Sequence, residues 1–177
     1  GIQDNVHGLT KLLQTQLQDA PLTKTDEITS FTSTGYTLGA SSGSYTNATA
    51  GNYNAYSFVK KPGFFDIVTY TGDGQTSQQI AHSLGCVPGM FVVKRLDGSD
   101  HWNVYNRGIG NTGCLKWDNT DAVQENSNQW NNTDPTSTHF TVGSSGRVNA
   151  SGGEYVCYLF AGGQNTATTA KSVAFDG

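Results

Sequence analysis

The chain is 177 residues long, which is enough for one or two domains with a buried core. Only 14% of its residues are charged, against roughly 25% in an average soluble protein. Its aromatic content of 11% argues against a disordered chain. The net charge of −4, with ten Lys and Arg residues spread along the chain, argues against nucleic-acid binding. No apolar run approaches the roughly 20 residues that a membrane-spanning helix needs.

The first candidate element is the leucine-rich segment 9–17. Leu9, Leu12, Leu13 and Leu17 are spaced as on one face of a helix. A β-structure is the alternative, and a second copy of the segment later in the chain helps to decide between the two.

An internal repeat relates the two parts of the chain with an offset of 102 residues. Residues 47–58 align with residues 149–160, and an Asn, an Ala, a Gly, two Tyr and a Phe coincide. Further upstream, residues 35–39 match residues 139–143 with an offset of 104. The drift of two residues falls in a Ser- and Gly-rich stretch, where loops tolerate insertions.

The repeat divides the chain into three parts. We expect the C-terminal half of a first β unit at 1–60, a complete unit at 64–161, and a linker or the first strand of a further domain at 162–177. Because the first unit is incomplete and the first residue is Gly rather than Met, we expect a longer repetitive polypeptide.

The second copy also favours β-structure at segment 9–17. Its counterparts there include Cys114, Trp117 and Asn119 among Gly and Asn residues, which is a poor helix-forming run. The aligned aromatic pairs Tyr53/Tyr155 and Phe58/Phe160 are expected in the core of both units.

The three cysteines are expected to be free thiols in packed positions. They are odd in number and lack metal-ligand spacing. Cys114 stands where the first copy has Leu12, and Cys157 stands where it has Ala55. A position that holds Cys in one copy and an apolar residue in the other is a packing position.

Strands and turns alternate between residues 64 and 106. Residues 65–71 are predicted as a strand, followed by a tight hairpin turn at 72–74 and a second strand at 79–84. Residues 90–96 are the most apolar candidate, expected at the centre of a sheet and paired antiparallel with residues 101–106.

Later strands are expected at 114–117, 140–142 and 155–160. About seven short strands in one unit, with a turn every 8–12 residues, predict an all-β fold. We expect antiparallel β-sandwich repeats of jelly-roll type, in about one and a half units.

A string of motifs in the complete unit resembles one known family. The motifs lie at residues 63–74, 82–85, 87–90, 92–95, 102–105 and 149–161. The string resembles the tandem domain of very long virion structural or tail-fibre proteins of marine bacteriophages, and the similarity covers nearly all of residues 5–161. It implies a location on the virion surface or outside the cell.

The end of the chain resembles a second kind of domain. Residues 172–177 are similar to the first strand of the lectin-like (laminin-G/concanavalin-type) domain that often follows these repeats. The resemblance implies that a carbohydrate-binding type of domain follows.

No pattern in the chain predicts catalysis. The four histidines are scattered, and no Gly-x-Ser-x-Gly motif is present. Asp66, Asp118 and Glu154 are the candidate carboxylates for glycoside hydrolysis, but nothing in the sequence places any two of them together, and Glu154 aligns with Asn52 in the other copy. The acidic turn 97–100 leaves a calcium site open as an alternative to a simple turn. We expect no enzyme activity, no cofactor and no metal site.

Exposed aromatic residues are the remaining candidates for a binding surface. Trp117 lies where the first copy has Thr15, and Trp130 stands in a polar loop, so neither is required by the shared core and both are expected to be exposed. Trp102 is expected in the core, with Tyr105 on the opposite face of the same strand. Packing is the alternative role for all four aromatic residues.

The predicted function is a structural or adhesion module of a virion fibre or appendage, which acts as a spacer and in host-receptor or glycan binding. The alternatives are an extracellular glycan-binding module of a bacterium and a carbohydrate-active enzyme whose catalytic part lies outside this chain. The expected partners are other repeats or copies of the same long protein and a cell-surface glycan, with a homo-oligomer as a further possibility. Nucleic acid and membrane insertion are not expected.

Overall fold

A computed structural model describes residues 1–40 and 46–162 of the chain. These residues are almost all in antiparallel β-strands and loops, as the sequence predicts. The elements are β1 (Lys11–Leu12), β2 (Leu22–Thr23), β3 (Ile28–Phe31), β4 (Tyr36–Leu38), β5 (Phe65–Thr71), β6 (Gln78–Ala81), β7 (Pro88–Arg95), β8 (Asn103–Asn106), β9 (Gly113–Lys116), β10 (Gln124–Glu125), α1 (Ser127–Trp130), β11 (His139–Val142), α2 (Gly146–Asn149) and β12 (Glu154–Ala161).

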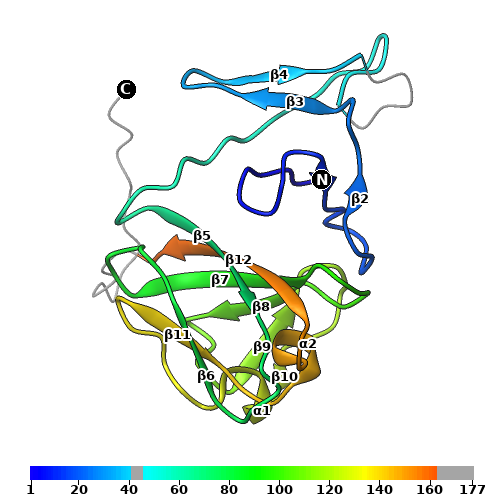
Figure 1. Cartoon of the computed structure of the whole chain (residues 1–177). Coiled ribbons are helices and arrows are strands. Elements are labelled where there is room, and N and C mark those ends of the chain that lie inside the picture. Colours follow the sequence, from blue (N-terminus) through cyan, green and yellow to red (C-terminus); the bar gives the residue numbers. More distant parts are fainter. Residues whose placement is uncertain (41–45, 163–177) are drawn as a thin grey trace.

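The complete unit is a β-sandwich of one large and one small sheet (Figure 1). The large sheet has six strands in the order β10-β9-β8-β7-β12-β5, and the small sheet pairs β11 with β6. Strand β7 lies inside the large sheet and pairs antiparallel with β8, as predicted for the most apolar segment. The predicted strands from residue 65 to residue 160 are all confirmed, with shifts of at most three residues at their ends.

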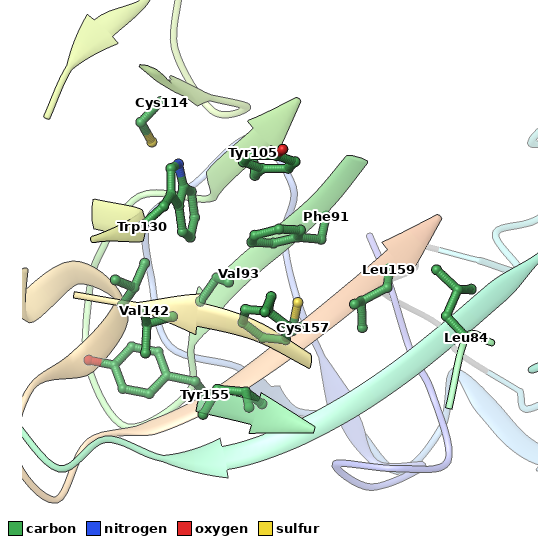
Figure 2. Close-up of a cluster of buried hydrophobic side chains, with 13 residues drawn as sticks. Leu84, Phe91, Val93, Tyr105, Cys114, Trp130, Val142, Tyr155, Cys157 and Leu159 are labelled. Atoms are coloured by element: carbon green, nitrogen blue, oxygen red, sulfur yellow. The ribbon is translucent and has the colours of Figure 1, made fainter. Parts of the chain in front are cut away.

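The inner core fills the space between the two sheets (Figure 2). Aromatic rings dominate it: Phe91 stacks on Tyr105 with the ring centroids 4.7 Å apart, and it meets the edge of Trp130 at 5.0 Å. The buried members of this core are Ile80, Leu84, Phe91, Val93, Tyr105, Cys114, Trp130, Phe140, Val142, Val148, Tyr155, Cys157 and Leu159.

An outer core covers the opposite face of the large sheet. Residues 1–20 lie across this face, on the side away from β6 and β11 (Figure 1). Leu13 is fully buried there against the sheet, and Ile2 packs beside it. The buried residues of this core are Leu13, Phe65, Ile67, Val92, Trp102, Val104, Val156 and Tyr158. The large sheet is therefore apolar on both faces.

Polar contacts also hold the N-terminal segment on the sheet. The ammonium group of the buried Lys94 donates to the carbonyl oxygen of Gln18 at 2.9 Å. The indole N–H of Trp102 donates to the carbonyl oxygen of Leu17 at 3.1 Å, and the hydroxyl of Tyr158 donates to Asp4 at 2.7 Å. Lys94 also donates to the carbonyl oxygen of Arg95 at 2.9 Å. Burial lowers the pKa of the Lys94 ammonium group, and because the group is buried, its N–H donors need these two carbonyl acceptors.

The backbone pairing of residues 1–40 repeats that of the complete unit with the offset of 102. Ile2 pairs with Leu13, as Val104 pairs with Leu115. In the next pair of strands, Leu12 faces Leu22 in β1 and β2, as Cys114 faces Gln124 in β9 and β10. The segment 9–17 is therefore β-structure and not a helix, as the repeat predicts.

Loop hydrogen bonds repeat as well. The amide of Ala48 donates to the hydroxyl of Tyr53 at 2.9 Å, and the amide of Ala150 donates to the hydroxyl of Tyr155 at 2.8 Å. The amide of Gly39 donates to the carbonyl of Glu27, and its counterpart Gly143 donates to the carbonyl of Gln129. Residues 1–60 thus hold the back half of the same unit, from the counterpart of β8 onward.

The last strand of the first unit is the main difference between the copies. Residues 52–59 align with β12, yet they join no strand among the described residues, and all of them are exposed. Tyr53 and Phe58 are 46% and 51% exposed, so their predicted place in a core is wrong. Their counterparts Tyr155 and Phe160 do pack against the two cores. The repeat shows that residues 1–60 hold only the back half of a unit, but not that the partners of β12 lie in the front half, as β5 and β7 do.

The predicted hairpin at 72–74 is also wrong. Strand β5 pairs with β12 in the large sheet, whereas β6 pairs with β11 in the small one. The turn therefore carries the chain between sheets. Gly72 packs so closely on the carbonyl of Ala150 that a Cβ would lie 2.3 Å from its oxygen, which explains a glycine at this position.

The cysteines are free thiols, as predicted. Cys114 and Cys157 are buried in the inner core, and Cys86 is half-buried. Burial raises the pKa of the Cys114 thiol to about 11, so the thiol stays protonated at neutral pH.

The boundary predicted near residue 60 is crossed by the outer core, in which Leu13 packs with side chains of the complete unit. Of the predicted tail at 162–177, only Gly162 lies within the described residues, and the lectin-like strand at 172–177 lies outside them. In the parts that the structure describes, no helix has the length and apolar character to cross a bilayer.

The buried carboxylate of Asp66 ties Lys60, in the segment between the two units, to the start of β5. Its carboxylate accepts hydrogen bonds from the amides of Ile67 and Ser83. It also forms an ion pair with Lys60 at 2.7 Å. Burial alone would raise the pKa of the Asp66 carboxyl, but Lys60 and the two amides outweigh it and hold the pKa below its ordinary value of 3.8.

We expect Leu13→Ala to lower the free energy of unfolding by about 2–5 kcal/mol, because it empties a fully buried position in the outer core. Leu17→Ala is the matched control. Leu17 lies in the same segment but is 39% exposed, so its loss should change stability by about 0.5 kcal/mol or less. Urea denaturation followed by Trp fluorescence measures both, and equal effects would contradict the packing of residues 1–20 on the sheet.

The lowered pKa of Asp66 predicts that the free energy of unfolding depends on pH. Because its folded pKa is lowered, the carboxylate stabilises the fold above its unfolded pKa near 4, and this contribution is lost as the pH falls through the folded value. Asp66→Asn should therefore be less stable than the wild type at pH 7, by about 1–3 kcal/mol. The difference should shrink as the pH approaches 2. A difference that stays constant between pH 7 and pH 2 in denaturation curves would count against this role.

Candidate functional site

The four candidate aromatic residues separate into three buried side chains and one exposed one. Trp102 is buried in the outer core, as predicted, and Tyr105 is buried in the inner core on the opposite face. Trp130 is fully buried, so its predicted exposure is wrong. Only Trp117, with 49% of its surface exposed, can contact a ligand without unfolding the core.

Trp130 is buried because the polar loop around it folds into a short helical turn. The side chain of Asn126 caps α1 by accepting the amide of Asn128 at 3.1 Å, and Asn131 ends the helix in the left-handed conformation. This turn places the ring of Trp130 in the inner core, where its N–H donates to the carbonyl of Gly113 at 3.1 Å. Asn126 and Asn131 therefore serve as caps beside a buried ring.

Trp117 sits at the end of β9 on a rigid support. Its amide donates to the carbonyl of Trp102 at 3.0 Å, which continues the pairing of β8 and β9 by one residue. Its ring meets the buried ring of Trp102 at a centroid distance of 6.2 Å and an angle of 62°. The exposed indole is therefore held by the outer core of the complete unit.

The residues after Trp117 form a hydrogen-bonded turn. The carboxylate of Asp118 accepts from the amide of Trp102 at 2.9 Å and contacts the ring nitrogen of His101 at 2.8 Å. Asn119 and Asp121 bond to each other twice, amide to side chain and side chain to side chain. The hydrogen bond from Lys116 to Asp121 lowers the pKa of that carboxyl, which stays charged.

A shallow, open depression lies beside the ring of Trp117. It is lined by Thr15, Gln16, Trp117, Asp118, Asn119 and Thr120. Thr15 and Gln16 come from the first unit and are the counterparts of Trp117 and Asp118, so each copy contributes the same turn. Phe58 likewise meets its own counterpart Phe160, with the ring centroids 5.7 Å apart. Matched residues of the two copies therefore lie near each other at two places, Thr15 with Trp117 and Phe58 with Phe160.

The depression combines an apolar ring with polar side chains. A flat indole beside polar groups suits a ligand with one apolar face and hydroxyl edges, such as a sugar ring. The candidate carboxylates each have their own partners: Asp118 is held by His101, Asp66 by Lys60, and Glu154 accepts from Thr71. Among residues 1–40 and 46–162, no group of three or more His, Cys, Asp or Glu is arranged to hold a metal ion.

The sequence identifies Trp117 but not its surroundings. Thr15, Gln16 and Asn119 are ordinary polar loop residues in the sequence, and their place beside the ring depends on how the two units pack. The repeat offers one signal, because it aligns Thr15 with Trp117 and so marks the same turn in both copies.

Comparison with known proteins assigns the chain to a family without a known activity. No curated protein and no solved structure matches the sequence. A family model described as a domain of unknown function (DUF7483) matches residues 1–167, which include both the incomplete and the complete unit. The chain therefore belongs to the DUF7483 family.

Proposed function

We propose that the chain is a structural and adhesion module of a virion fibre or appendage, built from tandem β-sandwich units. The observation that carries this proposal is the recurrence of the same strand pairs at an offset of 102 residues, as in Ile2–Leu13 and Val104–Leu115. Tandem units that contact their neighbours add length in proportion to their number, which is what a fibre needs. The resemblance of the complete unit to phage fibre domains supports the virion surface as its location.

The contact between units supports a spacer function in particular. The second unit covers one face of its large sheet with residues of the first, so that neighbouring units share a core. A shared apolar core restricts the motion of one unit relative to the next more than a flexible linker would. Partners of this kind are other repeats of the same protein, and the net charge of −4 gives no support to nucleic acid as a partner.

The exposed ring of Trp117 supports a second function, binding of a cell-surface glycan. Its position beside Gln16 and Asn119 combines an apolar face with amide groups. Repetition of such weak sites along a fibre would raise the overall affinity for a surface that carries many copies of one sugar. The same observation favours the alternative, an extracellular glycan-binding module of a bacterium.

We expect the chain to bind a subset of bacterial lipopolysaccharide and capsular polysaccharide spots on a glycan array, and Trp117→Ala to lower the signal at least about tenfold by removing the stacking surface. Phe31→Ala is the matched control. It removes an aromatic side chain that is 41% exposed on β3, away from the depression, and should leave the signal unchanged.

Loss of binding in both variants, or in neither, would contradict a site at Trp117.

Labelling with an antibody against the chain distinguishes a location on the virion from a location on the bacterial surface. Label along the fibres of phage particles supports the virion module, whereas label confined to the surface of uninfected bacteria contradicts it. Release of soluble sugar from any of the polysaccharides by the chain alone would contradict the proposed non-enzymatic function.

A further inference from the structure

The first unit ends in a segment that has the sequence of a central strand but none of its neighbours. Residues 52–59 align with β12 without a gap. In the complete unit, β12 pairs with β5 along one edge and with β7 along the other, over nearly its whole length. Residues 52–59 pair with no strand of the part that the structure describes.

The exposure of matched residues shows how much apolar surface this leaves in water. Tyr56 is 86% exposed, whereas its counterpart Tyr158 is 5% exposed. Val59 is 76% exposed, whereas its counterpart Ala161 is partly buried against the inner core. Exposed apolar side chains beside unpaired backbone N–H and C=O groups mark a site where strands can be added.

The rest of the first unit shows which strands are missing. Ile2 corresponds to β8, β1 corresponds to β9, and β2 corresponds to β10. In the large sheet of the complete unit, the strand that follows β8 is β7. In the complete unit β11 pairs with β6, whereas in the first unit the aligned strand β4 pairs with β3 instead. Residues 1–40 and 46–60 therefore hold no counterparts of β5, β6 and β7, which are consecutive in the sequence.

We propose that residues 52–59 are the docking site for the front half of a repeat unit, a segment with counterparts of β5, β6 and β7. Its first and third strands would pair with the two edges of residues 52–59, and its second strand would pair with β4. Nothing in this docking depends on whether the array belongs to a virion or to a bacterium, so it stands independently of the proposed function.

The inner-face side chains of the segment fit such a front half. Tyr53, Ala55 and Ser57 align with the residues of β12 that point into the inner core, Tyr155, Cys157 and Leu159. The loop that positions Tyr53 is already formed, because its hydroxyl holds the amide of Ala48 as Tyr155 holds Ala150. Only Ser57 is much smaller than its counterpart, Leu159, which leaves room for a larger side chain on the incoming half.

The test is to supply the missing half within the same chain. Since Gly1 is the counterpart of Asn103, a second copy of residues 62–102 fused in front of Gly1 restores the order of a complete unit. Amide hydrogen exchange, followed by mass spectrometry of peptides that cover residues 53–59, reports strand pairing directly. Residues 155–161 in β12 provide the reference for a paired strand within the same protein.

We expect exchange at residues 53–59 to be fast in the original chain and at least about 100-fold slower in the extended one, because paired strands exchange only through opening of the sheet. The control is the same extension with Val92→Pro in the added copy. It removes a backbone N–H from the middle of the strand that must pair, so protection should be lost.

A third extended chain carries Ser57→Leu, which restores the leucine of the complete unit and should increase the protection. Equal exchange at 53–59 with and without the proline, whether fast or slow, would overturn the proposal. So would fast exchange in the Ser57→Leu chain while residues 155–161 stay protected. Loss of protection at 155–161 would show that the added strands compete for β12, which also contradicts docking at 52–59.

Discussion

Strand β12 is paired along both edges and buried on both faces, and the rest of the structure depends on this constraint. Its inner side chains require the small sheet, and its outer side chains Val156 and Tyr158 require a second cover. Residues 1–20 supply that cover. Because apolar surface contributes roughly 25 cal/mol per Å² when it is removed from water, a large sheet left bare on its outer face would lose much of its stability. The complete unit is thus stabilised by its incomplete neighbour.

The two copies show one sequence pattern in two environments. Where the pairing partners lie within the chain, as for Ile2 with Leu13, the backbone of the first unit is the same as that of the second. Where they are absent, the aligned segment stays unpaired at residues 52–59, and β4 pairs with β3. Local sequence therefore determines strand tendency, loops and caps, whereas the position in a sheet depends on distant segments.

This distinction explains which features can be predicted from the sequence. Alternation and turn residues place the strands of the complete unit and its antiparallel class, and the repeat identifies segment 9–17 as β-structure. The turn at 72–74 looks like a hairpin in the sequence because the sequence of a strand does not show which distant strand it pairs with. Trp130 looks exposed because the side chains that cap its helical turn are polar.

The burial of the large sheet on both faces does have a signal in the sequence, the adjacent apolar pair Val92–Val93, since a strand with apolar residues on both faces is buried on both sides. Exposure of Trp117 follows from its lack of an apolar counterpart, but the residues around it come from two units and require the fold.

The central claim is that residues 1–60 form the back half of the unit that is complete at 64–161. Cross-strand nuclear Overhauser effects measured by NMR test it most directly. The structure predicts contacts between the backbone protons of Ile2 and Leu13 and of Leu12 and Leu22, matched by contacts between Val104 and Leu115 and between Cys114 and Gln124. Contacts between residues three apart along 9–17, which are typical of a helix, would contradict the claim, as would the absence of the first two contacts while the matched pair in the complete unit is observed.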